Sequence, residues 1–93
     1  MRAVTFDLPR PNPGRESLTL RFLMPKAATV RLEIYDAAGR RVRELAAGTS
    51  PAGERTLQWD FRDDAGANVP AGIYLARLDV EGRILTRKIA RLD

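Results

Sequence analysis

Cysteine and histidine are both absent from this sequence of 93 residues. Without cysteine the chain can form neither a disulfide nor a thiolate metal site, so its stability must come from apolar burial and backbone pairing. Without histidine it lacks the commonest general base and the commonest zinc ligand. No apolar run approaches the roughly 18–20 residues that a membrane-spanning helix needs. These absences argue against a hydrolase and against a transmembrane helix.

Lysine is scarce, whereas arginine is abundant. Of the 16 basic residues only Lys26 and Lys88 are lysine, and with 12 acidic residues the formal net charge is +4. Such an excess attracts anionic partners at long range, although the simpler interpretation is that the arginines solvate the outer faces of strands. The opening residues, 1–4, do not have the pattern of a signal peptide, but a domain taken from the end of a longer precursor would also lack one.

Apolar and polar residues alternate with a period of two along most of the chain, which is typical of half-buried strands. The clearest strand predictions are residues 18–22 and 30–34. Further strands are expected over residues 4–8, 40–45, 56–60, 73–80 and 83–92. The Asp-Ala-Ala-Gly segment at 36–39 predicts a hairpin turn, because Asp bonds following backbone amides and Gly accepts a positive φ. Residues 46–53, which are mostly small, predict a loop.

About seven short strands with turn signals between them predict an all-β fold, an immunoglobulin-like antiparallel β-sandwich. A small closed barrel is the alternative, but the odd strand count and the uneven loops favour the sandwich. Pro9, Pro11 and Pro13 interrupt strand pairing because each lacks a backbone donor. We therefore expect an edge strand and proline-rich lead-in over residues 1–15, followed by the sandwich domain over residues 16–93.

Trp59 is the only tryptophan and lies in a predicted strand, where it alternates with polar neighbours. A large aromatic side chain at such a position contributes heavily to a small core. We expect it to be buried among leucines from four predicted strands, namely Leu20, Leu32, Leu57 and Leu78.

An acidic cluster surrounds Gly66 and is the best candidate for a metal site. Asp60, Asp63, Asp64 and Asn68 supply oxygen atoms of the kind that calcium prefers. The spacing does not match a helix–loop–helix calcium loop, and no glutamate closes the cluster. Turn formation alone explains Asp, Asn and Gly in this pattern, so we expect no metal here.

Other polar residues also fit structural roles better than catalytic ones. Four glutamates are expected at outward or loop positions in solvated ion pairs: Glu33, Glu44, Glu54 and Glu81. Ser17 and Ser50 have no histidine to activate them. Binders of single-stranded nucleic acid combine basic residues with exposed aromatic platforms, whereas only Tyr35 and Phe61 are expected to be exposed here. We therefore expect no catalytic residue, no cofactor, no metal and no nucleic-acid partner.

Short motifs in a fixed order give a resemblance that periodicity alone does not supply. They are Pro11-Asn12-Pro13, Ile34-Tyr35-Asp36, Gly39-Arg40, Pro51-Ala52-Gly53, Trp59-Asp60, Gly72-Ile73-Tyr74 and Thr86-Arg87-Lys88-Ile89. In this order they resemble the C-terminal sorting domains of type IX secretion. The immunoglobulin-like domain of flagellar hook-capping proteins shares the same pattern. The resemblance covers residues 9–92, which is almost the whole chain.

The resemblance implies a domain that acts by being recognised. In such proteins it lies at the C-terminus of a secreted cargo, is bound by the outer-membrane export machinery, and can be removed when the cargo is anchored to the cell surface. The end of the chain, directly after the last predicted strand, fits a C-terminal signal. Arg91 and the other basic residues of that strand are expected to face outward. The residues that the resemblance marks for recognition are Gly72, Tyr74, Arg87, Lys88 and Ile89.

Three functions stay open at this point. The first is a monomeric sorting and attachment domain of a larger bacterial precursor, secreted or at the cell surface, whose partners are an N-terminal cargo domain and the export machinery. The second is a structural or adhesive immunoglobulin-like module similar to the hook-capping domain. The third is a small carbohydrate- or nucleic-acid-binding module that uses an arginine-lined face. None of the three is an enzyme.

Overall fold

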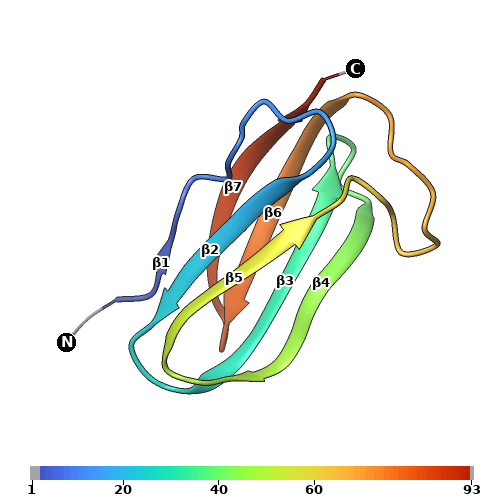
Figure 1. The fold of residues 1–93 in the computed structure, drawn as a ribbon. Coiled ribbons are helices and arrows are strands. Elements are labelled where there is room, and N and C mark those ends of the chain that lie inside the picture. The colour runs from blue at the N-terminus through green and yellow to red at the C-terminus, as the bar shows by residue number, and fades with distance from the viewer. Residues whose placement is uncertain (1–2, 93) are drawn as a thin grey trace.

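Two antiparallel sheets face each other in the computed structural model, which describes residues 3–92 (Figure 1). The first sheet has the strand order β1-β2-β5 and the second the order β4-β3-β6-β7. The strand bounds are β1 Thr5–Phe6, β2 Leu18–Met24, β3 Ala28–Asp36, β4 Arg41–Ser50, β5 Gly53–Trp59, β6 Gly72–Val80 and β7 Arg83–Arg91. The predicted immunoglobulin-like sandwich of seven strands is confirmed, and the closed barrel is excluded by the two separate sheets. Met1, Arg2 and Asp93, at the ends of the two predicted units, lie outside the described residues.

The connection between β4 and β5 differs from the prediction. Residues 46–53 were expected to form a loop, but β4 continues to Ser50 and β5 begins at Gly53. Small residues pair well here because larger ones face them across the strands: Ala46 lies opposite Leu32, and Gly48 lies opposite Val30. The extended conformation of this part of β4 therefore depends on its pairing with β3 and not on the strand propensity of its own residues.

The proline-rich stretch lies along the sandwich. Arg10 forms an antiparallel bridge with Thr19 of β2, and Gly14 forms a parallel bridge with Arg91 of β7. The stretch therefore crosses from one sheet to the other. Figure 1 shows it, in blue, rising from β1 to lie beside the end of β7. Among the described residues, no helix is long and apolar enough to span a membrane.

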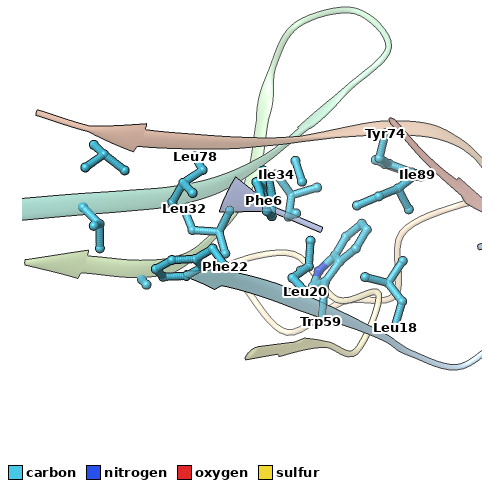
Figure 2. Close-up of a cluster of buried hydrophobic side chains, with 14 of the residues drawn as sticks. Phe6, Leu18, Leu20, Phe22, Leu32, Ile34, Trp59, Tyr74, Leu78 and Ile89 are labelled. Carbon is cyan, nitrogen blue, oxygen red and sulfur yellow. The ribbon is translucent and has the colours of Figure 1, made fainter. Parts of the chain in front are cut away.

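The core lies between the two sheets and is closed at one end by three aromatic rings. Trp59 is fully buried, and its ring centroid lies 4.9 Å from that of Phe61 and 5.4 Å from that of Tyr74, both in edge-to-face contact. The indole Nε1 donates a hydrogen bond to the carbonyl oxygen of Arg62 at 2.9 Å. Figure 2 shows Trp59 beside Leu20, with Tyr74 on the opposite sheet.

The predicted burial of Trp59 is therefore confirmed. The leucines expected around it belong to the same apolar cluster: Leu20, Leu32 and Leu78 are buried, and Leu57 packs against the cluster while partly exposed. The expected exposure of Phe61, in contrast, is wrong, because its backbone has a positive φ of 58° and its ring is fully buried.

Glu33 was expected to be solvated, but its exposed fraction is only 5%. Tyr35 donates its hydroxyl to Glu33 Oε1 at 3.0 Å, and Arg41 Nη1 lies 3.2 Å from Glu33 Oε2. These neighbours cover the carboxylate and supply the donors that a buried charge requires. The hydrogen bond to Glu33 also raises the pKa of Arg41.

Replacing Trp59 by alanine should severely destabilise the fold. Truncation of a buried aromatic costs about 3–5 kcal/mol, whereas a domain of this length has only about 5–14 kcal/mol in total. Chemical denaturation should show a large loss for Trp59→Ala and almost none for Leu8→Ala, whose side chain is 72% exposed. Equal unfolding midpoints for Trp59→Ala and the parent would contradict this account of the core.

Candidate recognition surface

The last strand, β7, has two faces with different roles. Side chains of alternate residues point to opposite faces of a strand. Ile89 is fully buried, and Arg87 and Arg91 share its face. The expectation that these two arginines face outward is therefore wrong. Lys88 lies on the opposite face and is exposed.

Arg87 and Arg91 cover aromatic rings that belong to other parts of the chain. The guanidinium carbon of Arg87 lies 5.5 Å from the ring centroid of Phe6 in β1, and that of Arg91 lies 5.3 Å from Phe61. Arg91 Nη1 also donates to the carbonyl oxygen of Val69 at 2.7 Å. A cation over an aromatic face is stabilised by the ring quadrupole. Both arginines therefore connect β7 to the rest of the sandwich.

Tyr74, at the start of β6, is also a core residue. Its exposed fraction is 4%, and its hydroxyl donates to the carbonyl oxygen of Pro70. The expectation that the ring packs and the hydroxyl finds a partner is confirmed. Burial raises the pKa of Tyr74, because the phenolate would lose its hydration, and the nearby charge of Arg91 opposes this effect.

Of the five residues that the sequence marks for recognition, two are exposed in the structure, Gly72 and Lys88. Gly72 has a φ of 152°, and a Cβ added there would meet no atom within 4 Å, so backbone conformation and not crowding favours glycine. Lys88 pairs with Leu75 of β6. The structure brings all five residues to the β6–β7 hairpin, but Lys88 alone among them presents an exposed side chain, since Gly72 has none. A recognition role for the five stays a prediction.

A side-chain amide closes part of the free edge of β7, which sequence reasoning missed. Asn12 Nδ2 donates to the carbonyl oxygen of Lys88 at 2.9 Å, and Asn12 Oδ1 accepts from the backbone N–H of Ala90 at 3.0 Å. Gly14 continues the pairing, donating to Ala90 at 2.9 Å and accepting from Leu92 at 2.7 Å. The Pro11-Asn12-Pro13 motif was the available signal, but it does not reveal its partner strand.

Gly14 is required at this position by close packing. A Cβ placed on it would lie 2.9 Å from Cζ of Phe61 and 3.1 Å from the carbonyl oxygen of Pro11. Real Cβ contacts are essentially never so short with a ring that is itself fixed in a core. The backbone of the lead-in can therefore approach β7 only because residue 14 has no side chain.

The carboxylates of the acidic cluster around Gly66 bind other groups of the same chain. Asp63 Oδ1 accepts the backbone N–H groups of Ala65 and Ala67, at 3.0 and 2.9 Å. Asp60 Oδ1 lies 3.1 Å from Arg43 Nη1. Asp64 caps β4, because its N–H donates to Val42 and its Oδ1 accepts from Glu44. Within the described residues, no group of three acidic, histidine or cysteine side chains is arranged to hold a metal ion.

A hollow of about 490 Å³ adjoins this cluster, between the β3–β4 turn and the loop before β6. Its charged groups are already paired: Arg40 Nε lies 3.2 Å from Asp36 Oδ2, and Arg41 Nη2 lies 3.7 Å from Asp64 Oδ2. The backbone N–H of Arg40 holds the pKa of Asp36 below its usual value.

The fold and these features define an immunoglobulin-like module with a closed core and a partly open sheet edge at β7. A family model described as the FlgD Ig-like domain matches residues 10–82. The chain therefore belongs to the FlgD Ig-like domain family, and the resemblance drawn from its motifs is confirmed. A search of curated proteins gives no match.

Solved structures with a similar fold include proteins of flagellar assembly and of type IX secretion. Dimeric latent PorU from Porphyromonas gingivalis is 26% identical over 99% of this chain, with a TM-score of 0.75. FlgD from Xanthomonas campestris, described with hook capping in flagellar assembly, is 26% identical over 94% of this chain, with a TM-score of 0.63. PorZ, an essential surface component of the Porphyromonas gingivalis type IX secretion system, is 22% identical over 98%, with a TM-score of 0.60.

The chain spans only part of each of these proteins. It covers 10% of the PorU chain, 12% of the PorZ chain and 65% of the Xanthomonas FlgD chain. Each of these proteins therefore contains further sequence outside the matched part. The activities of the complete proteins do not follow from a match to this part.

Tyr74→Phe should lower the free energy of unfolding at neutral pH. It should also reduce the loss of that free energy at alkaline pH. Loss of the hydroxyl leaves the Pro70 carbonyl without its donor, which costs about 0.5–1.5 kcal/mol. The pKa of Tyr74 is raised by folding from 10.0. Its contribution is therefore complete below pH 10 and is lost as the pH rises through the folded pKa.

Urea denaturation across this pH range measures both effects. The parent and a Tyr35→Phe control should lose stability above pH about 10, and Tyr74→Phe should lose less. An identical alkaline decline in the parent and Tyr74→Phe would show that this tyrosine does not ionise more easily in the unfolded chain.

Proposed function

We propose that this chain is a sorting and attachment domain that directs a secreted cargo through type IX secretion to the cell surface. It acts by being bound and not by catalysis. The observation that carries the proposal is the likeness to PorU over 99% of the chain, at 26% identity and a TM-score of 0.75. The same fold in PorZ, a type IX surface component, supports it.

The β6–β7 hairpin is the part of the domain best suited to be recognised by the export machinery. Lys88 is exposed on the outer face, whereas Ile89 is buried and Arg87 is half-buried over Phe6. A receptor that binds the folded domain can therefore use the Lys88 ammonium and the exposed backbone near it. Replacement of such an exposed residue changes folding stability by no more than about 0.5 kcal/mol. Recognition and folding are thus separable at Lys88.

A structural or adhesive module similar to the hook-capping domain is the second candidate. It is favoured by the family match over residues 10–82 and by the likeness to FlgD from Xanthomonas campestris over 94% of the chain. In that case the domain would join neighbouring subunits, and no export machinery would read it.

An export assay separates the two candidates. Residues 1–93 are fused behind a signal peptide and a reporter in a bacterium that has the type IX machinery, with a strain lacking that machinery as control. The intact fusion should reach the surface only in the competent strain, and Lys88→Ala should accumulate in the periplasm. Lys26→Ala, at the only other lysine, is the matched control and should be exported normally.

Folding must be measured for each variant, because only a folded but unexported Lys88→Ala demonstrates recognition. Truncation of residues 86–93 is less informative, since it removes the buried Ile89. A fusion that never leaves the periplasm of the competent host would end the sorting proposal and leave the structural module in its place.

A further inference from the structure

The edge of β7 is closed along one half and open along the other. β7 is the last strand of the four-stranded sheet, with β6 as its only partner strand. The carbonyl of Lys88, both backbone groups of Ala90 and the N–H of Leu92 bind Asn12 and Gly14 on the side away from β6. Since β7 pairs with β6 without a register shift, the same alternation turns the backbone of Ile84 and Thr86 to the open side.

The open half has two partial covers, since β1 packs beside β7 with Phe6 under Arg87, and Arg87 itself reaches the backbone of Thr86. Arg87 Nη1 donates to the carbonyl oxygen of Thr86 at 2.8 Å, while the rest of its guanidinium lies over Phe6. Among the described residues no other hydrogen bond reaches the outward backbone groups of Ile84 or Thr86. An incoming strand can take over the Thr86 acceptor, which would release one Arg87 nitrogen for a new partner.

The charge on this strand is of one sign. Residues 82–92 contain four cations and no carboxylate: Arg83, Arg87, Lys88 and Arg91. The opposite edge of the sheet differs, because β4 carries Glu44 beside Arg43 and is capped by Asp64. An excess of one charge on an exposed strand favours a partner of the opposite charge and disfavours a second copy of the same strand.

The outer face beside the open half is mixed, because Ile84 lies opposite Asp79 and Thr86 lies opposite Arg77 of β6. Its exposed apolar side chains are Ile84 and Leu75, each 41% exposed, and Leu75 lies opposite Lys88. A strand added next to β7 would place alternate side chains along this face. The surface thus suits an extended segment that combines carboxylates with apolar side chains.

We propose that the open half of β7, residues 83–88, accepts an extended acidic segment of a partner protein as an additional strand. The backbone of Ile84 and Thr86 would supply main-chain hydrogen bonds, and Lys88, on the outer face, would bind the carboxylates. This inference rests on the proposed function, in that it names how the β6–β7 hairpin is bound and by what chemistry.

Peptide binding tests the inference directly. The probe is a labelled short peptide that alternates valine and glutamate, titrated into the intact domain, with amide chemical shifts followed by NMR. The largest shifts should map to Ile84, Thr86 and Lys88, and affinity should fall as salt is added. A peptide with lysine in place of glutamate should bind about tenfold or more weakly, because its charges repel those of β7.

Two further variants isolate the backbone contribution. An N-methylated form of the acidic peptide keeps its charge but loses donors, so it should bind about tenfold or more weakly. Ile84→Pro removes an outward N–H at an edge position where proline is tolerated, and it should abolish binding, whereas Lys26→Ala should bind like the parent. If Ile84→Pro does not fold, the N-methylated peptide alone tests whether backbone hydrogen bonds contribute to binding. Equal binding of the acidic, N-methylated and lysine peptides, or shifts confined to β4, would overturn the inference.

The outcome is distinguishable from that of the export assay. If the domain exports a reporter but binds no acidic peptide, strand addition is wrong and the sorting proposal is unaffected. If the peptide binds with the expected pattern but the fusion is not exported in a competent host, the binding edge stands and sorting is wrong.

Discussion

The edge-to-face packing of Trp59 between Phe61 and Tyr74 is the interaction on which the other features depend. With no disulfide in the chain, burial has to hold the two sheets together, and these rings join the end of β5 to the start of β6. The ring of Phe61 in turn packs against the backbone of Gly14, where a side chain would clash with it, and lies beneath the guanidinium of Arg91. The same ring cluster therefore sets the position of the lead-in along β7, and with it how much of that edge stays open.

Alternation was sufficient to predict most of the fold from the sequence. The strands around Leu20 and Leu32 were predicted directly, because their apolar residues face a single core. The end of β4 was not predicted as a strand, since Ala46 and Gly48 have weak strand propensity and are ordered by the residues opposite them. Phe61 was also missed: it follows a polar residue in a turn, and only its positive φ directs the ring inward.

The recognition surface was predicted less completely. The exposure of Lys88 followed from its place in the last strand, and the same alternation places Arg87 and Arg91 with the buried Ile89. Basic character alone had suggested that those arginines faced outward, but their long side chains cover aromatic rings. The cap formed by Asn12 could not be predicted, because its partner Lys88 is 76 residues away in the sequence.

Hydrogen exchange of individual backbone amides, followed by NMR, tests most directly whether β7 is half closed and half open. The amides of Ala90 and Leu92, which bind Asn12 and Gly14, should exchange slowly, and those of Ile84 and Thr86 should exchange rapidly. Asn12→Ala should speed the exchange of Ala90 and leave that of Ile84 unchanged. Uniform protection along the whole strand would contradict the account, since it would leave β7 without an open half for a partner.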